Sequence, residues 1–178
     1  VDKKMYYLKE VRLDADRLDN GQRSLLLSSD ILDASFNGYF EFAKLPAAFR
    51  EIIPRYLPNV LLPIKGASTT EEFTFSVELK NTAVVTENFF PQFYFDPATR
   101  LYGAVHAAQK SFDIHLDAPE LRYKTARWLD LTTEFSAQGS SMNINVYADT
   151  LYYSKNGYIP ELDLKAEVDN NRIDYRLR

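Results

Sequence analysis

The chain of 178 residues contains no cysteine, only two histidines and a single tryptophan. Without cysteine it has no disulfide framework, no thiolate metal site and no thiol nucleophile. This absence fits a cytosol, and it fits equally an oxidising compartment in which an unpaired thiol would be a liability. The printed residues include no apolar run long enough to span a membrane, no signal peptide and no lipid-attachment motif.

A basic stripe and the common catalytic motifs are also lacking. The net charge is −4 and the pI is about 5.3, with lysine and arginine spread along the chain, so no footprint for nucleic acid is present. No P-loop, GxGxxG, HExxH or GxSxG pattern occurs. We therefore expect a protein that is not an enzyme, that carries no cofactor and that does not bind nucleic acid.

The two histidines are the first candidates for a metal site. His106 and His115 fall on facing strands of a predicted hairpin, near Asp113 and Asp117. Such a cluster can hold zinc, but all four side chains lie on the polar side of the alternation, where solvation needs no ligand. Aspartates also crowd two predicted turns without the loop pattern of an EF-hand. We expect no metal site.

Alternation of apolar and polar residues is what the chain has in abundance. Hydrophobic residues make up 46% of it, and twelve phenylalanines and twelve tyrosines favour strands over helices. The clearest example runs from Ile31 to Phe42, where Phe36, Gly38 and Phe40 share one parity. Asn37-Gly38 is either a tight turn or a bend in a continuing strand, and the unbroken alternation favours the bend.

Similar alternation, separated by turn residues, extends over most of the chain. Asn20-Gly21 predicts a hairpin, Asp96 to Thr99 predicts a turn, and three-and-four spacing predicts a helix over Leu45 to Leu57. A shorter helix is expected over Asn81 to Phe90. The further predicted strands cover residues 7–15, 73–79, 93–95, 101–107, 112–118, 129–135, 142–148, 162–168 and 173–177.

The predicted fold is mainly β, a curled antiparallel sheet with one or two short helices. Residues 1–178 are expected to form one β-rich segment of a longer chain, with a helical insertion near 45–57. The apolar face of this sheet either meets a second sheet in a closed sandwich or stays partly open as a groove. Open strand edges would also allow the segment to pair with itself.

Several stretches resemble a known family. Leu25 to Phe42 (LLLSSDILDASFNGYFEF), followed by Leu45-Pro46, resembles the periplasmic strand repeats of TamB-like translocation and assembly proteins, related to the AsmA group. Phe75 to Thr82, Phe90 to Phe93, Pro97 to Gly103 and Ala118 to Tyr123 continue the likeness. It consists of strand and turn patterns and covers most of the chain.

The resemblance implies a periplasmic part of an inner-membrane-anchored protein of the cell envelope. Its β-structure would curl into a half-pipe, or β-taco, with a hydrophobic interior. Family members take part in outer-membrane biogenesis, through phospholipid movement or through assembly of outer-membrane proteins with a barrel partner. The anchor and the barrel-binding region would lie outside these 178 residues.

Our leading hypothesis is a non-enzymatic hydrophobic groove that conducts phospholipid across the periplasm. The alternatives are a chaperone-like factor that receives apolar strands of client proteins, and a closed sandwich that serves as an interaction module. The residues expected to line the groove are Phe36, Phe40, Phe42, Phe73, Phe75, Val77, Leu79, Val105, Phe112, Ile114, Leu116, Leu129, Leu131, Ile144, Val146, Leu162 and Leu164.

Overall fold

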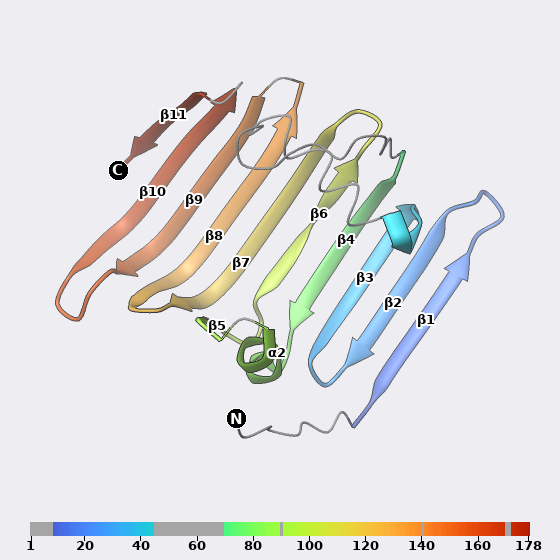
Figure 1. The fold of residues 1–178 in the computed structure, drawn as a ribbon, viewed down its shortest axis with the longest axis horizontal. Helices are drawn as coiled ribbons and strands as arrows, with labels where there is room; N and C mark the ends of the chain where they lie inside the picture. Colours follow the sequence, from blue (N-terminus) through green and yellow to red (C-terminus); the bar gives the residue numbers. More distant parts are fainter. Residues whose placement is uncertain (1–8, 45–69, 90, 140, 170–171) are drawn as a thin grey trace.

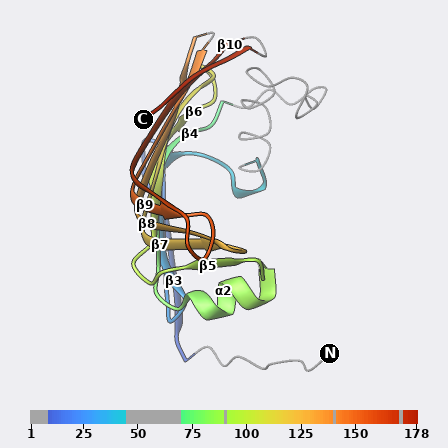
Figure 2. The ribbon, with the colours of Figure 1, turned by 90° about the vertical axis from the view of Figure 1, so that its left-hand side faces the viewer.

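The computed structural model describes residues 9–44, 70–89, 91–139, 141–169 and 172–178, and these form one open antiparallel sheet (Figures 1 and 2). Ten strands follow one another in the order β1-β2-β3-β4-β6-β7-β8-β9-β10-β11, and β5 pairs with β7 beside this path. The strands are β1 (Val11–Arg17), β2 (Arg23–Ser29), β3 (Leu32–Tyr39), β4 (Glu72–Leu79), β5 (Phe93–Phe95), β6 (Arg100–His106), β7 (Ser111–Tyr123), β8 (Ala126–Gln138), β9 (Ser141–Tyr152), β10 (Tyr158–Asp169) and β11 (Arg172–Leu177).

The predicted fold class is confirmed: the chain is mainly β, with an unclosed antiparallel sheet and a short helix. That helix is α2 (Thr82–Phe89), and a 3-10 turn, η1 (Phe42–Lys44), follows β3. The second sheet that a sandwich requires is not found among the described residues, whose strands all belong to one sheet. The helix predicted over Leu45 to Leu57 lies outside the described ranges.

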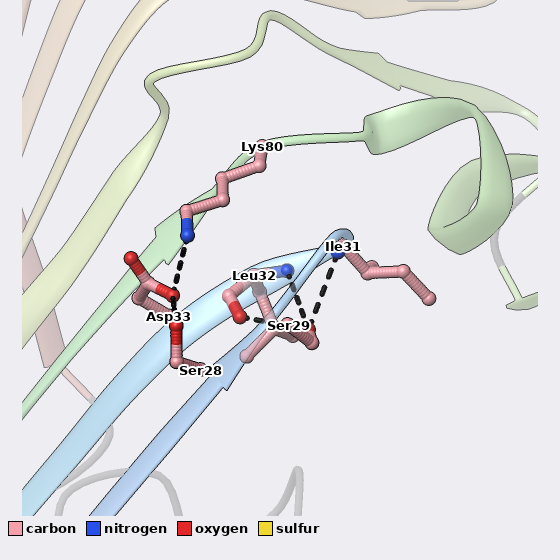
Figure 3. A network of polar contacts seen from close by, with 6 residues as sticks. All are labelled: Ser28, Ser29, Ile31, Leu32, Asp33 and Lys80. Carbon is pink, nitrogen blue, oxygen red and sulfur yellow. Dashed lines mark hydrogen bonds and ion pairs between the residues drawn. The ribbon is translucent and has the colours of Figure 1, made fainter. Parts of the chain in front are cut away.

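The turns follow from their local side chains. Between β2 and β3, the Ser29 Oγ accepts hydrogen bonds from the Ile31 and Leu32 amides at 3.2 and 3.1 Å, and it donates to the Leu32 carbonyl at 2.8 Å (Figure 3). The Ser29 side chain thus provides the hydrogen-bond partners for backbone groups within this tight turn. The Asn20-Gly21 hairpin between β1 and β2 is confirmed by their pairing from Val11↔Ser29 to Arg17↔Arg23.

The strand β3 runs through Asn37-Gly38 without a turn, as the alternation predicts. Gly38 has φ +142°, and a Cβ at this position would lie 2.2 Å from the Glu72 carbonyl oxygen. Only glycine fits here, because both the backbone conformation and the close approach of β4 exclude a side chain. The Asn-Gly pair therefore allows close strand contact instead of reversing the chain.

Alternation gives the whole sheet one apolar and one polar face. Because each pair of neighbouring strands is in register, apolar residues lie opposite apolar residues from edge to edge. One such row reads Leu25, Phe36, Phe75, Gly103, Ile114, Phe135, Ile144, Ala166 and Tyr175. The apolar face faces the side on which η1 lies, since Phe40 precedes η1 and packs on Phe36 and Phe73 (Figure 2).

The strands β7 to β10 bend sharply near their lower ends in Figure 1, and Figure 2 shows these ends turning toward the side of α2. Asp130 and Glu161 have φ values of +46° and +51°, and neither residue has a ladder partner. Ala118 and Ala148 are 2% and 0% exposed beside them. Small side chains at these positions leave room for the backbone to fold inward.

The bend reverses the alternation below it, which corrects the sequence prediction for Leu129. Trp128, and not Leu129, packs with Leu131 on the apolar face, because Asp130 turns the backbone between them. Leu129 lies on the polar face, opposite Glu120. Phe42 belongs to η1 and not to a strand: the Glu41 amide donates to Glu71 Oε2 at 3.0 Å and no longer takes part in the ladder.

The predicted short helix is confirmed as α2, beginning one residue after Asn81. The chain is held at its start because the Lys80 and Asn81 amides both donate to the Ile31 carbonyl, at 2.7 and 3.0 Å. Before β6, the Asp96 to Thr99 turn is closed by the Thr99 amide and hydroxyl, which both donate to the Asp96 carbonyl at 3.1 and 2.7 Å. These turns place β6 beside β4.

Gly103 offers a test of how closely β6 and β7 approach. A Cβ at Gly103 would lie 2.1 Å from the Asp113 carbonyl oxygen and 2.9 Å from the Ile114 Cα, so Gly103→Ala should force the strands apart. We expect it to lower the free energy of unfolding by about 2–3 kcal/mol, measured by urea denaturation. Gly139→Ala, where no atom lies within 4 Å, is the control and should cost about 1 kcal/mol for its positive φ alone. Equal losses in the two variants would contradict the steric account.

Candidate functional site

The candidate site is a single row of residues on the apolar face, here called the central apolar row. Directly opposed pairs carry it through all ten strands of the path, from one edge to the other. Its members are Leu13, Leu27, Ala34, Val77, Leu101, Leu116, Thr133, Val146, Leu164 and Leu177. Nine are apolar, one is a neutral hydroxyl residue, and none carries a charge.

On its upper side the row is bordered by a buried phenylalanine cluster. The rings of Phe36, Phe40, Phe73 and Phe75 lie 5.8 to 6.3 Å apart, at the distances that favour tilted and edge-to-face contact. Phe73 is only 2% exposed. The cluster continues across the sheet through Val105, Phe112, Ala137, Met142 and Val168.

On its lower side, along β7 to β10, the row is bordered by the residues at the bend. Ala118, Leu131, Ala148 and Leu162 form a second buried cluster, against which Leu121, Trp128, Leu151 and Ile159 pack. The turned strand ends therefore lie beside the central apolar row, which runs across the strands between two buried clusters.

The central apolar row is more accessible than the clusters that border it. Leu101, in the middle of the sheet, is 38% exposed, while Leu13 and Leu177, at the two edges, are 60% and 55% exposed. Most of the row between these points is half-buried. Apolar surface that stays partly accessible and reaches both edges of a sheet is typical of a binding surface.

The structure distributes the predicted groove residues over several layers. Val77, Leu116, Val146 and Leu164 lie in the central apolar row. The next row toward the phenylalanine cluster contains Phe36, Phe75, Ile114 and Ile144. The two buried clusters contain Phe40, Phe73, Val105, Phe112, Leu131 and Leu162. Leu79 ends β4 on the same face. Leu129 lies on the polar face and Phe42 begins η1, as described above.

Six residues of the row are absent from the sequence-based list: Leu13, Leu27, Ala34, Leu101, Thr133 and Leu177. The four leucines were already on the apolar parity of their strands. Only strand order and register show that they share a row with Val77, because alternation assigns a face but not a height on that face. Thr133 carried no signal, since threonine occurs on either face of a sheet.

Thr133 is the exception within the row. Its side chain is 8% exposed, and its Oγ1 is buried without a hydrogen-bond partner within the part of the chain that the structure describes. A buried hydroxyl without a partner is costly because it has lost its hydrogen bonds to water. Thr133 thus contributes a buried hydroxyl without a partner to an otherwise apolar row.

The polar face carries ion pairs. Asp33 accepts hydrogen bonds from Lys80 Nζ at 2.6 Å and from Ser28 Oγ at 2.8 Å, which joins β2, β3 and the end of β4 (Figure 3). The Lys80 bond, followed by that of Ser28, holds the pKa of Asp33 below its usual value. A hollow of about 600 Å³ beside it is lined by Arg12, Asp14 and Glu78, among others. Most residues that line this hollow belong to the polar face, and Leu27 and Ala34 of the central apolar row also contribute to its lining.

The histidines are not brought together. His115 pairs with Asp113 and stacks on Tyr102 with ring centroids 5.0 Å apart, whereas His106 Nδ1 lies 3.2 Å from Glu72 Oε1. Burial, followed by the charge of Asp117, raises the pKa of Tyr102. Within the described ranges, no three side chains of His, Asp or Glu are grouped to hold a metal ion.

Comparisons with protein-family models, with curated proteins and with solved structures found no match to this chain. The likeness to TamB and AsmA proteins stays a prediction from the residues themselves. In the part of the chain that the structure describes, no helix has the length and apolarity needed to cross a membrane.

The bend is reinforced on the polar face by Glu120, which is bonded by Arg122 and Arg127. Arg122, which also lies over the Tyr94 ring at 4.7 Å, contributes most to holding the pKa of Glu120 below its usual value, and Arg127 adds to it. A folded-state pKa below the unfolded value means that this stabilisation is present above about pH 4.5 and is lost as the pH falls through the folded pKa.

Glu120→Gln should therefore lower the free energy of unfolding by about 1 kcal/mol at pH 7, because the carboxylate and its two charge-assisted bonds are removed. The difference between wild type and variant should shrink as the pH is lowered below 4.5. Urea denaturation at a series of pH values measures this. A difference independent of pH would mean that the ion pairs contribute nothing.

Thr133→Val should raise the free energy of unfolding by about 1 kcal/mol, because valine keeps the shape of threonine and removes the unpartnered hydroxyl. Thermal and urea unfolding both report the change. The neighbouring Thr132, exposed on the polar face, provides the matched control: Thr132→Val should alter stability by less than about 0.5 kcal/mol. Destabilisation by Thr133→Val would show that the hydroxyl has a partner in solution.

Proposed function

We propose that the apolar face binds acyl chains, and that this chain is a non-enzymatic part of a hydrophobic conduit for phospholipid. The observation that carries the proposal is the central apolar row, which runs in register through ten strands and is exposed at both edges. A closed core would bury its outermost apolar side chains, but Leu13 and Leu177 are more than half exposed.

The dimensions and chemistry of the row suit an acyl chain. Ten strands have nine spacings of about 4.8 Å, so the row is about 43 Å long, against about 15 Å for the hydrocarbon of one bilayer leaflet. Each CH₂ group withdrawn from water is worth about 0.8 kcal/mol. Because the central apolar row carries no charge, it would hold an acyl chain without fixing its position and so permit sliding along the row.

The surroundings of such a conduit follow from the family resemblance. As part of an inner-membrane-anchored protein, this segment would lie in the periplasm, and the longer chain would provide the membrane anchor and the contact to an outer-membrane barrel partner. The role would be in outer-membrane biogenesis. The unclosed sheet supports this proposal, since an open half-pipe needs one sheet with two free edges.

A second candidate function is favoured by those edges. The outer sides of β1 and β11 have no neighbouring strand among the described residues, and all six residues of β11 are exposed. An exposed edge can accept an extended segment by adding it as a further strand. A chaperone-like factor for apolar strands of outer-membrane or secreted proteins would use the same sheet in this way.

Val77 and Ser76 are a matched pair for testing the lipid proposal. They are neighbours in β4, both half-buried, and they point to the apolar and the polar face respectively. A photocrosslinking residue in place of Val77 should capture phospholipid from vesicles and in cells, at least about tenfold more than the same probe in place of Ser76. Mass spectrometry of the captured adducts identifies the ligand.

Equal capture at the two positions would contradict binding by the apolar face. Capture of polypeptide at Val77, without lipid, would favour the chaperone-like function over the conduit. Unfolding curves of both probe variants should match that of the wild type, so that a difference in capture reports the face and not a loss of structure.

A further inference from the structure

The two edges of the sheet are complementary in direction. The ten strands of the path alternate, so β11 runs antiparallel to β1 (Figure 1). A second copy placed beside the first would bring its β11 against β1 as one more antiparallel neighbour. Both edges show apolar side chains on the same face: Val11, Leu13, Ile173 and Tyr175 are 56%, 60%, 55% and 74% exposed. The sheet could therefore continue into a second copy with its apolar face on one side.

The charges of the two edges are also complementary. On the polar face, β1 and the residue before it present Glu10, Arg12, Asp14 and Asp16, and β11 and the residue after it present Arg172, Asp174, Arg176 and Arg178. Within these, Glu10, Arg12 and Asp14 are acidic-basic-acidic, and Arg172, Asp174 and Arg176 are basic-acidic-basic. In one antiparallel register, these three residues of each edge meet opposite charges across the strands.

We propose that β11 of one copy pairs with β1 of a second copy in this register. Val11 then lies opposite Tyr175, and Leu13 lies opposite Ile173. On the polar face the pairs are Glu10 with Arg176, Arg12 with Asp174, and Asp14 with Arg172. The edge-to-edge contact is an interaction of this chain with itself, and it is independent of whether the apolar face binds lipid.

Registers shifted by one or two residues are disfavoured. A slip of two residues in one direction places Arg12 opposite Arg176 and Asp14 opposite Asp174; a slip in the other direction places Arg12 opposite Arg172 and Glu10 opposite Asp174. Like charges directly opposite each other destabilise strand pairing. A slip of one residue puts the apolar side chains of one copy on the polar face of the other.

The charged side chains are already oriented on their strands. Within each edge, neighbours on the polar face pair with one another: Arg12 with Asp14 at 2.8 Å and Arg172 with Asp174 at 3.0 Å. These pairs are exposed and individually weak. Burial of the four apolar side chains supplies the attraction, and the charges select the register by excluding its alternatives.

The contact joins two different edges, so among the described residues each copy keeps one edge without a neighbouring strand. Such a head-to-tail interface does not close on itself unless rotation brings the ends together, and it produces a linear series of copies. The register pairs Leu13 with Ile173 and not with Leu177, so successive central apolar rows are staggered along the strands. The apolar face nevertheless continues from copy to copy.

The absence of cysteine makes a crosslinking test possible without background. In the double variant Val11→Cys, Tyr175→Cys, oxidation should link copies into dimers and longer species on non-reducing gels, because the two positions face each other directly. In the control Leu13→Cys, Tyr175→Cys the positions are diagonal neighbours, about 7–8 Å apart and outside disulfide reach. We expect at least about tenfold less linkage in this control.

Single-cysteine variants test the symmetric alternative. If two copies paired β11 with β11, or β1 with β1, then Tyr175→Cys alone or Val11→Cys alone would form dimers, and that result would overturn the proposal. The absence of intermolecular linkage in the double variant at high protein concentration would overturn it as well.

A charge exchange across the interface provides an independent measurement. Arg12→Asp and Asp174→Arg each place like charges opposite each other, and each should weaken self-association about three- to tenfold in sedimentation equilibrium. A mixture of the two variants should recover wild-type association, because every contact between unlike partners then pairs opposite charges. Asp174→Arg loses its ion pair with Arg172 and gains Glu167 as an opposite charge on the neighbouring strand, so urea unfolding of each variant is compared with that of the wild type. Failure of the mixture to recover, or a wild type that stays monomeric at all concentrations, would overturn the proposal.

Discussion

The strict register of ten antiparallel strands is the constraint on which the rest of this structure depends. Alternating side chains divide a sheet into two faces, but a face becomes continuous only if opposed residues in neighbouring strands agree. Here they agree at every step from Leu13 to Leu177. The result is a sheet whose one side is apolar across its full width, while the other carries charges and hydrogen bonds such as those of Asp33.

A wide apolar face on a single sheet is costly to expose to water, and here its two ends are buried more than its middle. The phenylalanine cluster packs ring on ring at one end of the strands, and at the other end β7 to β10 bend at Asp130 and Glu161 and turn over the face. Between them the central apolar row is left half-buried. The arrangement supports the proposed binding of acyl chains along the row, and it explains why the predicted groove residues range from deeply buried to accessible.

The edges of the sheet allow the same in-register pairing between two copies of the chain. Open edges invite pairing, and proteins often protect them with charges. The charges on β1 and β11 pair within each strand, yet their order also matches across the two edges. The same residues can thus keep an isolated edge soluble and specify the edge that fits it, which links the interaction of copies to the continuity of the apolar face.

The sequence by itself determined the strands, the face of most side chains and the position of the turns, because these depend on alternation and on local residues such as Gly38 and Ser29. It did not determine strand order, register or the bend. Leu129 was assigned to the wrong face because the positive φ of Asp130 reverses the alternation. The residue types at these two positions do not predict the reversal. Leu13, Leu101 and Leu177 were left out because their shared row exists only once strands distant in sequence lie side by side. Which face a side chain occupies depends on its own strand. Which residues of other strands lie beside it depends on strand order and register, and these exist only in the assembled sheet.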